Sequence, residues 1–189
     1  MIKLGIKLES HSDKYNKKNY ETHIYLFKYS EWIREKIIKY KFRNYTYLYR
    51  FFSECILEIN KKDKFLERYD YMIPIPISKK RKKQRGYNQS ELIAKEIVKN
   101  VPNIGILSGI IVKNVDNKPQ STLSGEARRE NVKGVYSINK NIIKDIDISN
   151  KKVLLFDDIY TTGSTVNECA GVLKKIGFLN IDVLTIAKD

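Results

Sequence analysis

The chain is poor in cysteine and has no long apolar segment. Cys55 and Cys169 are the two cysteines among its 189 residues, and they form neither a C-x-x-C pair nor a disulfide framework. We therefore expect both to be core residues. No apolar run approaches the roughly 20 residues that a membrane-spanning helix needs, and residues 1–10 lack the apolar stretch of a secretory signal. These absences favour a cytoplasmic protein without a membrane span.

Acidic residues are scarce relative to basic ones. The chain has 22 Asp and Glu against 36 Lys and Arg, which gives a formal net charge of +14. A charge of this sign indicates polyanionic ligands, and pyrophosphate, nucleotides and nucleic acid all qualify. Charge alone is weak evidence for DNA binding, because Lys, Asn, Ile and Tyr are all abundant, as an AT-rich genome would give. The length suits one domain, with room for a small appendage.

The apolar pattern predicts an α/β fold with a parallel-rich sheet and helices on both faces, preceded by an N-terminal helical segment. We expect residues 1–65 to form a polar segment and a hood-like helical pair, and residues 66–189 to form the core. The expected helices cover residues 30–40, 45–60 and 165–176, with another beginning near residue 88. The expected strands cover residues 2–8, 69–77, 110–115, 135–138, 151–157 and 181–187. A long polar connection covers residues 116–134.

The most informative segment is the one in which an apolar strand ends in two adjacent carboxylates, Asp157 and Asp158. A short loop and the start of a helix follow, with the residues Thr161, Thr162, Gly163, Ser164 and Thr165. Ionised carboxylates accept hydrogen bonds from a vicinal diol, and a helix N-terminus offers N–H groups to a phosphate. This order predicts a site for a phosphorylated ribose. An ordinary turn with an N-cap would explain the hydroxyl residues but not the paired carboxylates, whose repulsion needs an offsetting partner.

The run FDDIYTTGST resembles the phosphoribosyl pyrophosphate (PRPP) signature of type I phosphoribosyltransferases. The resemblance implies that Asp157 and Asp158 hold the ribose 2′ and 3′ hydroxyls and act as the catalytic carboxylates, and that Thr161 to Thr165 bind the 5′-phosphate. It also implies Mg²⁺, which PRPP would carry rather than a dedicated set of protein ligands. The sequence does not identify the acceptor of a phosphoribosyl group. It also leaves open whether the protein catalyses the transfer.

A strongly basic segment, Lys79–Arg85, lies between a predicted strand and a predicted helix, and six of its seven residues are Lys or Arg. Type I phosphoribosyltransferases carry a pyrophosphate loop at the corresponding place. The residues that we expect to bind pyrophosphate by this resemblance are Lys79, Lys80, Arg85, Gly86 and Arg128. Nucleic-acid binding and plain solvation remain open for the basic segment, and plain solvation remains open for Arg128.

A narrower resemblance starts at the run R-G-Y-N-Q, Arg85–Gln89, which is similar to the ComF family of competence-associated proteins. Pro74-Ile75-Pro76 before it and Gln120-x-x-Leu123-x-x-x-x-Arg128-x-x-Asn131 after it also match, so that the resemblance covers about residues 24–189. ComF proteins commonly begin with a cysteine-rich zinc-binding module. This chain has no cysteine before Cys55, so we expect neither that module nor zinc.

Two functions follow from the resemblance. The first is a PRPP-binding, ComF-like phosphoribosyltransferase with an unknown nitrogen acceptor. The second is a non-catalytic protein of the same fold that handles single-stranded DNA in competence, with tyrosines stacking on bases. The sequence leaves the oligomeric state open.

Overall fold

The computed structural model describes residues 6–10, 18–43, 45–115, 134–144 and 146–189. Its strands are β1 (Lys7–Ser10), β2 (Thr22–Lys28), β3 (Tyr71–Pro74), β4 (Gly105–Ile106), β5 (Ile111–Lys113), β6 (Tyr136–Ile138), β7 (Lys152–Tyr160) and β8 (Asn180–Lys188). Its helices are α1 (Glu31–Phe42), α2 (Leu48–Asp63), the 3-10 turn η1 (Phe65–Arg68), α3 (Lys79–Arg85), α4 (Gln89–Lys99), α6 (Lys140–Ile143) and α7 (Ser164–Lys174). None of the helices in these ranges is long and apolar enough to cross a bilayer.

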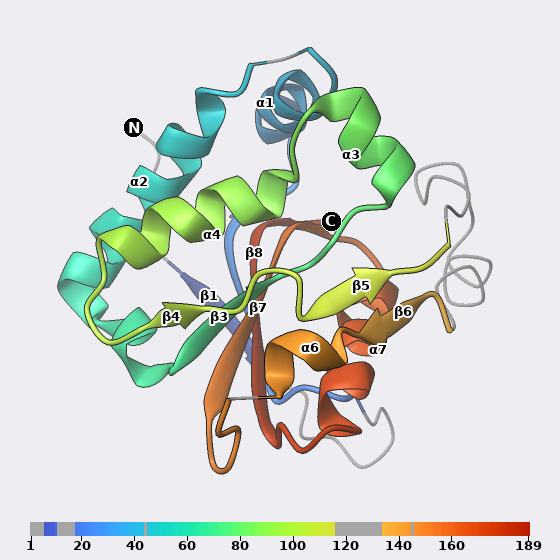
Figure 1. The fold of residues 1–189 in the computed structure, drawn as a ribbon. Coiled ribbons are helices and arrows are strands. Elements are labelled where there is room, and N and C mark those ends of the chain that lie inside the picture. Colours follow the sequence, from blue (N-terminus) through green and yellow to red (C-terminus); the bar gives the residue numbers. More distant parts are fainter. Residues whose placement is uncertain (1–5, 11–17, 44, 116–133, 145) are drawn as a thin grey trace.

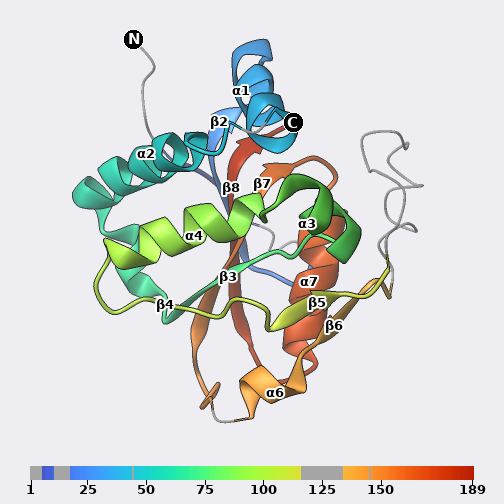
Figure 2. The ribbon, with the colours of Figure 1, turned by 45° about the horizontal axis from the view of Figure 1, so that its top comes forward.

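Within the described residues, six strands form one sheet in the order β1-β2-β8-β7-β3-β4, and β5 pairs with β6 separately. β1 is antiparallel to β2, whereas the other neighbours in the sheet are parallel. The helices α1, α2 and α4 pack on one face (Figure 1), and Figure 2 shows α7 on the opposite side of the sheet from α2 and α4. This arrangement confirms the predicted α/β fold with a parallel-rich sheet and helices on both faces.

The strand β7 lies inside the sheet because it is apolar on both faces. Leu154 and Phe156 belong to the core that α1, α2 and α4 complete, and Val153 and Leu155 belong to the core that α7 completes. Successive side chains of a strand point to opposite faces, so a strand that is covered twice is a continuous apolar run. Burial of each such side chain contributes about 1.5–3 kcal/mol. That burial anchors the strand whose end carries the two carboxylates.

The predicted helical pair is present as α1 and α2. In α1, the side chains of Ile33, Ile37 and Tyr40 recur every three or four residues and are buried. In α2, the side chains of Phe52 and Ile56 are fully buried in the same core as those three residues of α1. Each helix is thus stabilised by one stripe of apolar side chains that packs against the core on this face of the sheet.

The sequence analysis missed β2, and with it the way in which the N-terminal segment joins the sheet. β2 runs parallel to β8, with Ile24 opposite Leu184. The side chains from His23 to Leu26 are all buried, so the strand lacks the alternation of polar and apolar residues that marks a half-exposed strand. The expected division into residues 1–65 and 66–189 stays a prediction. It would separate β1 and β2 from the other four strands of the same sheet.

The two prolines in the segment 69–77 predicted an edge strand or a strand that ends early. β3 is not an edge strand, because it lies between β7 and β4. It does end early, at Pro74. The next residue, Ile75, donates its N–H to Phe156 O at 2.9 Å, so the ladder continues past the missing donor of the proline.

The basic segment was expected to be a loop, and it is the helix α3 instead. The Ser78 side chain caps its N-terminus by accepting a hydrogen bond from the Arg81 N–H, and Gly86 ends it in the left-handed conformation at a φ of 80°. Lys and Arg are good helix formers. Two well-formed caps therefore explain why a run of like charges is helical here.

Candidate functional site

The site predicted from the sequence lies at the carboxyl edge of the sheet. β3 and β7 are parallel neighbours, so the connection that leads from β3 into α3 and the connection that leads from β7 into α7 leave the same edge. Asp157 and Asp158 are near the end of β7, and Asp157 lies opposite Thr185 of β8. Tyr29, two residues before α1, donates its N–H to Lys188 O at 2.7 Å, and Figure 2 shows the C-terminus, which follows β8, beside α1. The structure thus brings α1 and α3 to the edge that carries the carboxylates.

Asp158 has the smaller solvent-exposed surface of the two carboxylates, and it has a cationic partner. Its side chain is 10% exposed, and its Oδ2 lies 2.7 Å from Nζ of Lys41, at the end of α1. The charge of Asp158 also acts on the Arg85 guanidinium: burial lowers the pKa of Arg85, and the charge of Asp158 opposes that shift. These cations supply the offsetting charge that a pair of adjacent carboxylates needs.

Asp157 lies in a different environment. Its Oδ1 accepts hydrogen bonds from Ser90 Oγ at 3.2 Å and from the Asp158 N–H at 2.9 Å. Burial, and next the charge of Asp158, raise the pKa of Asp157 to about 7, while the charge of Lys41 opposes the rise. This environment therefore shifts the pKa of Asp157 upward, away from the acid range in which aspartates normally titrate.

The loop after β7 makes a tight turn in which Gly163 is required. Its φ is 74°, and a Cβ at this position would overlap the side chain of Tyr160. Thr162 Oγ1 and Ser164 Oγ lie 2.7 Å apart, and α7 starts at Ser164 with Asn167 N–H donating to Gly163 O at 2.9 Å. The turn thus places the hydroxyls of Thr162 and Ser164 at the N-terminus of the 11-residue helix α7, which is the end of a helix that favours an anion. The binding of a phosphate there stays a prediction.

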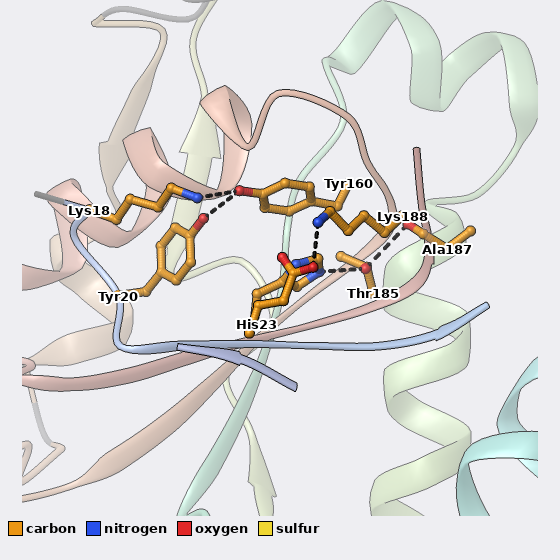
Figure 3. A network of polar contacts seen from close by, with 8 residues as sticks. Lys18, Tyr20, His23, Tyr160, Thr185, Ala187 and Lys188 are labelled. Carbon is orange, nitrogen blue, oxygen red and sulfur yellow. Dashed lines mark hydrogen bonds and ion pairs between the residues drawn. The ribbon is translucent and has the colours of Figure 1, made fainter. Parts of the chain in front are cut away.

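A network under this loop fixes the ring of Tyr160 (Figure 3). Tyr160 Oη accepts a hydrogen bond from Lys18 Nζ at 2.7 Å and lies 2.8 Å from Tyr20 Oη. The His23 ring stacks on the Tyr160 ring, with centroids 4.0 Å apart, and His23 Nε2 lies 2.9 Å from Thr185 Oγ1. The N-terminal segment therefore supports the side chain that packs against the turn at Gly163. Sequence reasoning missed this support, because residues 1–22 show no periodicity.

The R-G-Y-N-Q segment joins the end of α1 to the core. Tyr87 Oη donates a hydrogen bond to Tyr40 O, and the two rings stack with centroids 5.6 Å apart. Tyr40 Oη donates in turn to Gln89 O at 3.0 Å. The Arg85 guanidinium lies 4.7 Å from the centroid of the Phe42 ring. Residues on both sides of Lys41 are thus held by this segment.

The residues that were expected to bind pyrophosphate are only partly assembled around the carboxylates. Arg85 lies near Asp158, whereas Lys79 and Lys80 are exposed at the start of α3. Gly86 is exposed, with open space around its Cβ position. Arg128 lies outside the described residues, as do the other matches in the segment 120–131. The pyrophosphate role of these residues stays a prediction.

Lys41 is the site residue that sequence reasoning did not find. It lies one residue beyond the predicted helix 30–40, and no local pattern links it to Asp158, which is more than 100 residues away. The one signal that could have indicated it is indirect. Two adjacent carboxylates need a cation nearby, and Lys41 is one of several lysines near the end of the predicted helix. The structure identifies that cation.

No family model matches the chain. Comparison with curated proteins, however, finds relatives of the family that the R-G-Y-N-Q run resembles. Competence protein F of Haemophilus influenzae is 30% identical over 159 residues, which are 80% of this chain and 66% of that protein. Competence protein ComFC of Bacillus subtilis is 23% identical, over 80% of this chain and 58% of that protein. DNA utilization protein YhgH of Escherichia coli O157:H7 is 27% identical, over 65% of this chain and 51% of that protein. The chain thus spans between about half and two thirds of the length of these relatives.

Among solved structures, similarity is weaker. A purine phosphoribosyltransferase from Pyrococcus horikoshii is 14% identical, with 88% of each chain covered and a TM-score of 0.43. An adenine phosphoribosyltransferase from Saccharomyces cerevisiae is 12% identical, with 79% of this chain and 72% of that chain covered and a TM-score of 0.44. The similarity to its sequence relatives shows that the chain belongs to the ComF family of competence-associated proteins.

Proposed function

We propose that this protein binds PRPP, or a related phosphorylated ribose, at the carboxyl edge of β7 and transfers the phosphoribosyl group to a nitrogen acceptor. One observation carries the proposal: two adjacent carboxylates, Asp157 and Asp158, lead within a few residues into a glycine turn and the N-terminus of an 11-residue helix. Acceptors for a diol and donors for a phosphate therefore lie side by side on one segment.

In the proposed complex the ribose lies across the end of β7. Asp157 and Asp158 accept hydrogen bonds from the 2′ and 3′ hydroxyls, and Thr161, Thr162, Gly163, Ser164 and Thr165 bind the 5′-phosphate. Arg85 faces the pyrophosphate, with Lys79, Lys80, Gly86 and Arg128 as further candidates. The support for this orientation is that the carboxylates and the turn follow one another in the chain, so the ligand must span them in the same order.

Mg²⁺ belongs to this proposal as the ion that PRPP carries. Among the described residues, no group of three or more His, Cys, Asp or Glu side chains could hold a metal ion, so we place the cation on the ligand rather than in a protein cage. The carboxylates of Asp157 and Asp158 suit a hard cation nearby, because Mg²⁺ prefers oxygen. When bound, it neutralises charge on the pyrophosphate.

The proposed transfer breaks the bond between C1 and the pyrophosphate oxygen and forms a bond between C1 and the nitrogen of the acceptor, with inversion. The pyrophosphate leaves with the electron pair of the broken bond, and the acceptor nitrogen loses its proton to solvent. The protein contributes position and charge: the carboxylates orient the ribose and stabilise the positive charge that develops at C1, and the cations stabilise the leaving group.

Calorimetric titration of Mg²⁺ and PRPP into the protein tests the binding step. We expect saturable binding in the micromolar range and its loss in Asp158→Asn, because an amide presents only one acceptor oxygen and leaves Lys41 unpaired. Asp63→Asn, an exposed residue at the end of α2, is the matched control and should bind like the wild type. Absence of wild-type binding at millimolar PRPP would sink the proposal, and pyrophosphate release with some acceptor is needed to support transfer.

A second candidate function is the handling of single-stranded DNA without catalysis. A specific observation favours it: Phe42 at the end of α1, and Tyr45 and Tyr47 just before α2, are 68%, 38% and 61% exposed. The guanidinium of Arg85, in the basic helix α3, lies over the ring of Phe42. Exposed aromatic rings beside a cationic helix suit bases and phosphates. The names of the relatives, which refer to competence and DNA utilization, agree with this candidate.

Fluorescence anisotropy with a labelled single-stranded oligonucleotide tests the second candidate. We expect affinity to fall steeply with salt and to fall in Tyr47→Ala, while Leu179→Ala, an exposed apolar residue before β8, serves as the control. If Tyr47→Ala binds as the wild type does, the aromatic surface is not the DNA site.

A further inference from the structure

The end of α1 lies over one of the two carboxylates. Lys41 Nζ is 2.7 Å from Asp158 Oδ2, and the two side chains are 19% and 10% exposed. Water screens a pair at this depth far less than a surface pair. Removing the partner of either charge therefore leaves the other nearly buried and uncompensated, which is strongly unfavourable.

The backbone around Lys41 is fixed, whereas its side chain is long and flexible. Tyr40 is held by Tyr87 and Gln89, and Phe42 by Arg85. α1 thus cannot readily leave the edge of the sheet. The ammonium group of a Lys is a point charge on a four-carbon stem, so it can turn from Asp158 to another anion nearby without any movement of the helix.

Binding of a ribose diol changes the charges that surround Lys41. The hydroxyls are neutral donors that compete with the ammonium group for the oxygens of Asp158. Occupation of Asp158 by the diol weakens the ion pair unless the ligand places an anion of its own next to Lys41. The 5′-phosphate is at the far end of the sugar, on the turn at Gly163. With the 2′ hydroxyl, which is on C2, at Asp158, the substituent of the neighbouring carbon C1 is the group within reach of Lys41.

We propose that Lys41 is a specificity-determining residue of this site: when the diol takes Asp158, the ammonium group pairs with an anionic group on C1 of the ligand. The site therefore selects ribose 5-phosphates that carry a phosphate or pyrophosphate at C1 over ribose 5-phosphate itself. This inference rests on the proposed binding function and deepens it. It gives Lys41 a role that is separate from those of the basic residues of α3.

Arg85 is the other cation on which the charge of Asp158 acts, and in the proposed function it faces the pyrophosphate from a fixed position, whereas Lys41 changes partner. Its guanidinium stacks on Phe42, and that stacking fixes the direction of the group. Lys39, two residues before Lys41 on the same helix, pairs instead with Glu35. Lys39→Met therefore removes the same charge from the same helix without touching the carboxylates, which makes it a matched control.

Calorimetry with two ligands, PRPP and ribose 5-phosphate, each with Mg²⁺, tests the inference on the wild type, Lys41→Met, Lys41→Gln, Lys41→Arg and Lys39→Met. We expect the wild type and Lys39→Met to prefer PRPP. Lys41→Met should lose about tenfold or more in affinity for PRPP and should stay within roughly threefold of the wild type for ribose 5-phosphate. Lys41→Arg should retain much of the preference, because it keeps the charge.

Lys41→Gln guards against a folding defect, because its amide can still donate a hydrogen bond to Asp158. It should lose the preference as Lys41→Met does. If the two ligands lose affinity equally in Lys41→Gln, or if their ratio does not change, the inference is wrong while the proposed function stands. If the wild type binds neither ligand, the proposed function fails and the inference fails with it.

Discussion

Asp157 and Asp158 are neighbours in the chain, yet they differ in their surroundings. Asp158 pairs with Lys41, whereas Asp157 accepts its hydrogen bonds from a neutral hydroxyl and a backbone N–H. Burial and the adjacent charge raise the pKa of Asp157 to about 7. An ionised Asp157 is what a diol needs and what the fold disfavours, so at this residue function and stability are opposed.

This opposition predicts a difference in pH dependence between the wild type and Asp157→Asn. The pKa of Asp157 is raised in the folded state above its usual value of 3.8, so the folded state binds the proton more tightly than the unfolded chain does. That contribution to stability is complete below pH 3.8 and is lost as the pH rises through about 7. Between pH 5 and pH 8, Asp157→Asn should gain about 2–3 kcal/mol relative to the wild type.

Urea unfolding at a series of pH values measures this difference. The variant should also lose PRPP binding at every pH, which separates the effect on stability from the effect on function. Parallel stability curves for the two proteins would show that burial does not disfavour the ionised Asp157.

Gly163 gives a second prediction at the scale of one residue. Gly163→Ala must adopt a φ of 74° and must also move the Tyr160 side chain, whereas Gly86→Ala must adopt a φ of 80° in open space. The conformation alone costs about 1–2 kcal/mol for an alanine. We expect Gly86→Ala to lose about that amount and Gly163→Ala to lose about 1–3 kcal/mol more, as measured by urea unfolding. Equal losses would mean that the turn yields easily around Tyr160.

At the scale of elements, the R-G-Y-N-Q segment acts as a connector between α1 and the sheet. Asn88 Nδ2 donates to Ile75 O at 3.0 Å, and Tyr87 and Gln89 hold Tyr40. A run that resembles a family signature thus has a structural task here, which is to keep the end of α1 over the carboxylates. Its role in pyrophosphate binding is a separate proposal.

Tyr87→Phe tests this connection. It removes the hydrogen bond to Tyr40 O but keeps the ring stack, so we expect a loss of about 1 kcal/mol in stability and faster hydrogen exchange in the last turn of α1. PRPP affinity should fall a few-fold, because Lys41 is less well placed. Tyr71→Phe, which removes a half-exposed hydroxyl on β3, is the control. Unchanged exchange in α1 would contradict the connection.

At the scale of the whole molecule, the sheet has a second polar cluster at the edge opposite the site. Asp182, at the start of β8, is 3% exposed and accepts hydrogen bonds from Thr22 N at 2.9 Å and Tyr69 Oη at 2.8 Å. Lys152 Nζ lies 3.2 Å from its Oδ2. A pocket of about 560 Å³ opens there, between β1, β2, η1 and the first residues of β7 and β8.

This cluster predicts a variant that affects stability without affecting the site. Asp182→Asn puts an amide NH₂ where a carboxylate oxygen accepts a hydrogen bond, and it leaves Lys152 without its partner. We expect a loss of about 2–3 kcal/mol in urea unfolding, with PRPP affinity unchanged in the folded protein. Asp63→Asn, an exposed residue on the same pocket, should lose little. Altered PRPP affinity in Asp182→Asn would mean that the two edges of the sheet communicate.

Much of the fold could be predicted from the sequence, because β7 is a continuous apolar run and α7, α1 and α2 each carry their own apolar period. The strand β2 could not, because its buried segment is short and includes the polar residue His23, and its partner β8 is more than 150 residues away. The helix α3 could not be predicted either, because six of its seven residues are charged and it has no apolar period. In the site, the carboxylates and the turn are local and were found. Lys41 and the support of Tyr160 are long-range contacts, and no local pattern encodes such contacts.

The central claim is that the end of β7 and the turn into α7 bind a phosphorylated ribose. A crystal structure of the protein with Mg²⁺ and PRPP tests this claim most directly. We predict the ribose hydroxyls within hydrogen-bond distance of Asp157 and Asp158, and the 5′-phosphate on the N–H groups and hydroxyls of Thr161 to Thr165. Electron density for the ligand at the opposite edge of the sheet, or a site left empty at millimolar PRPP, would contradict the account.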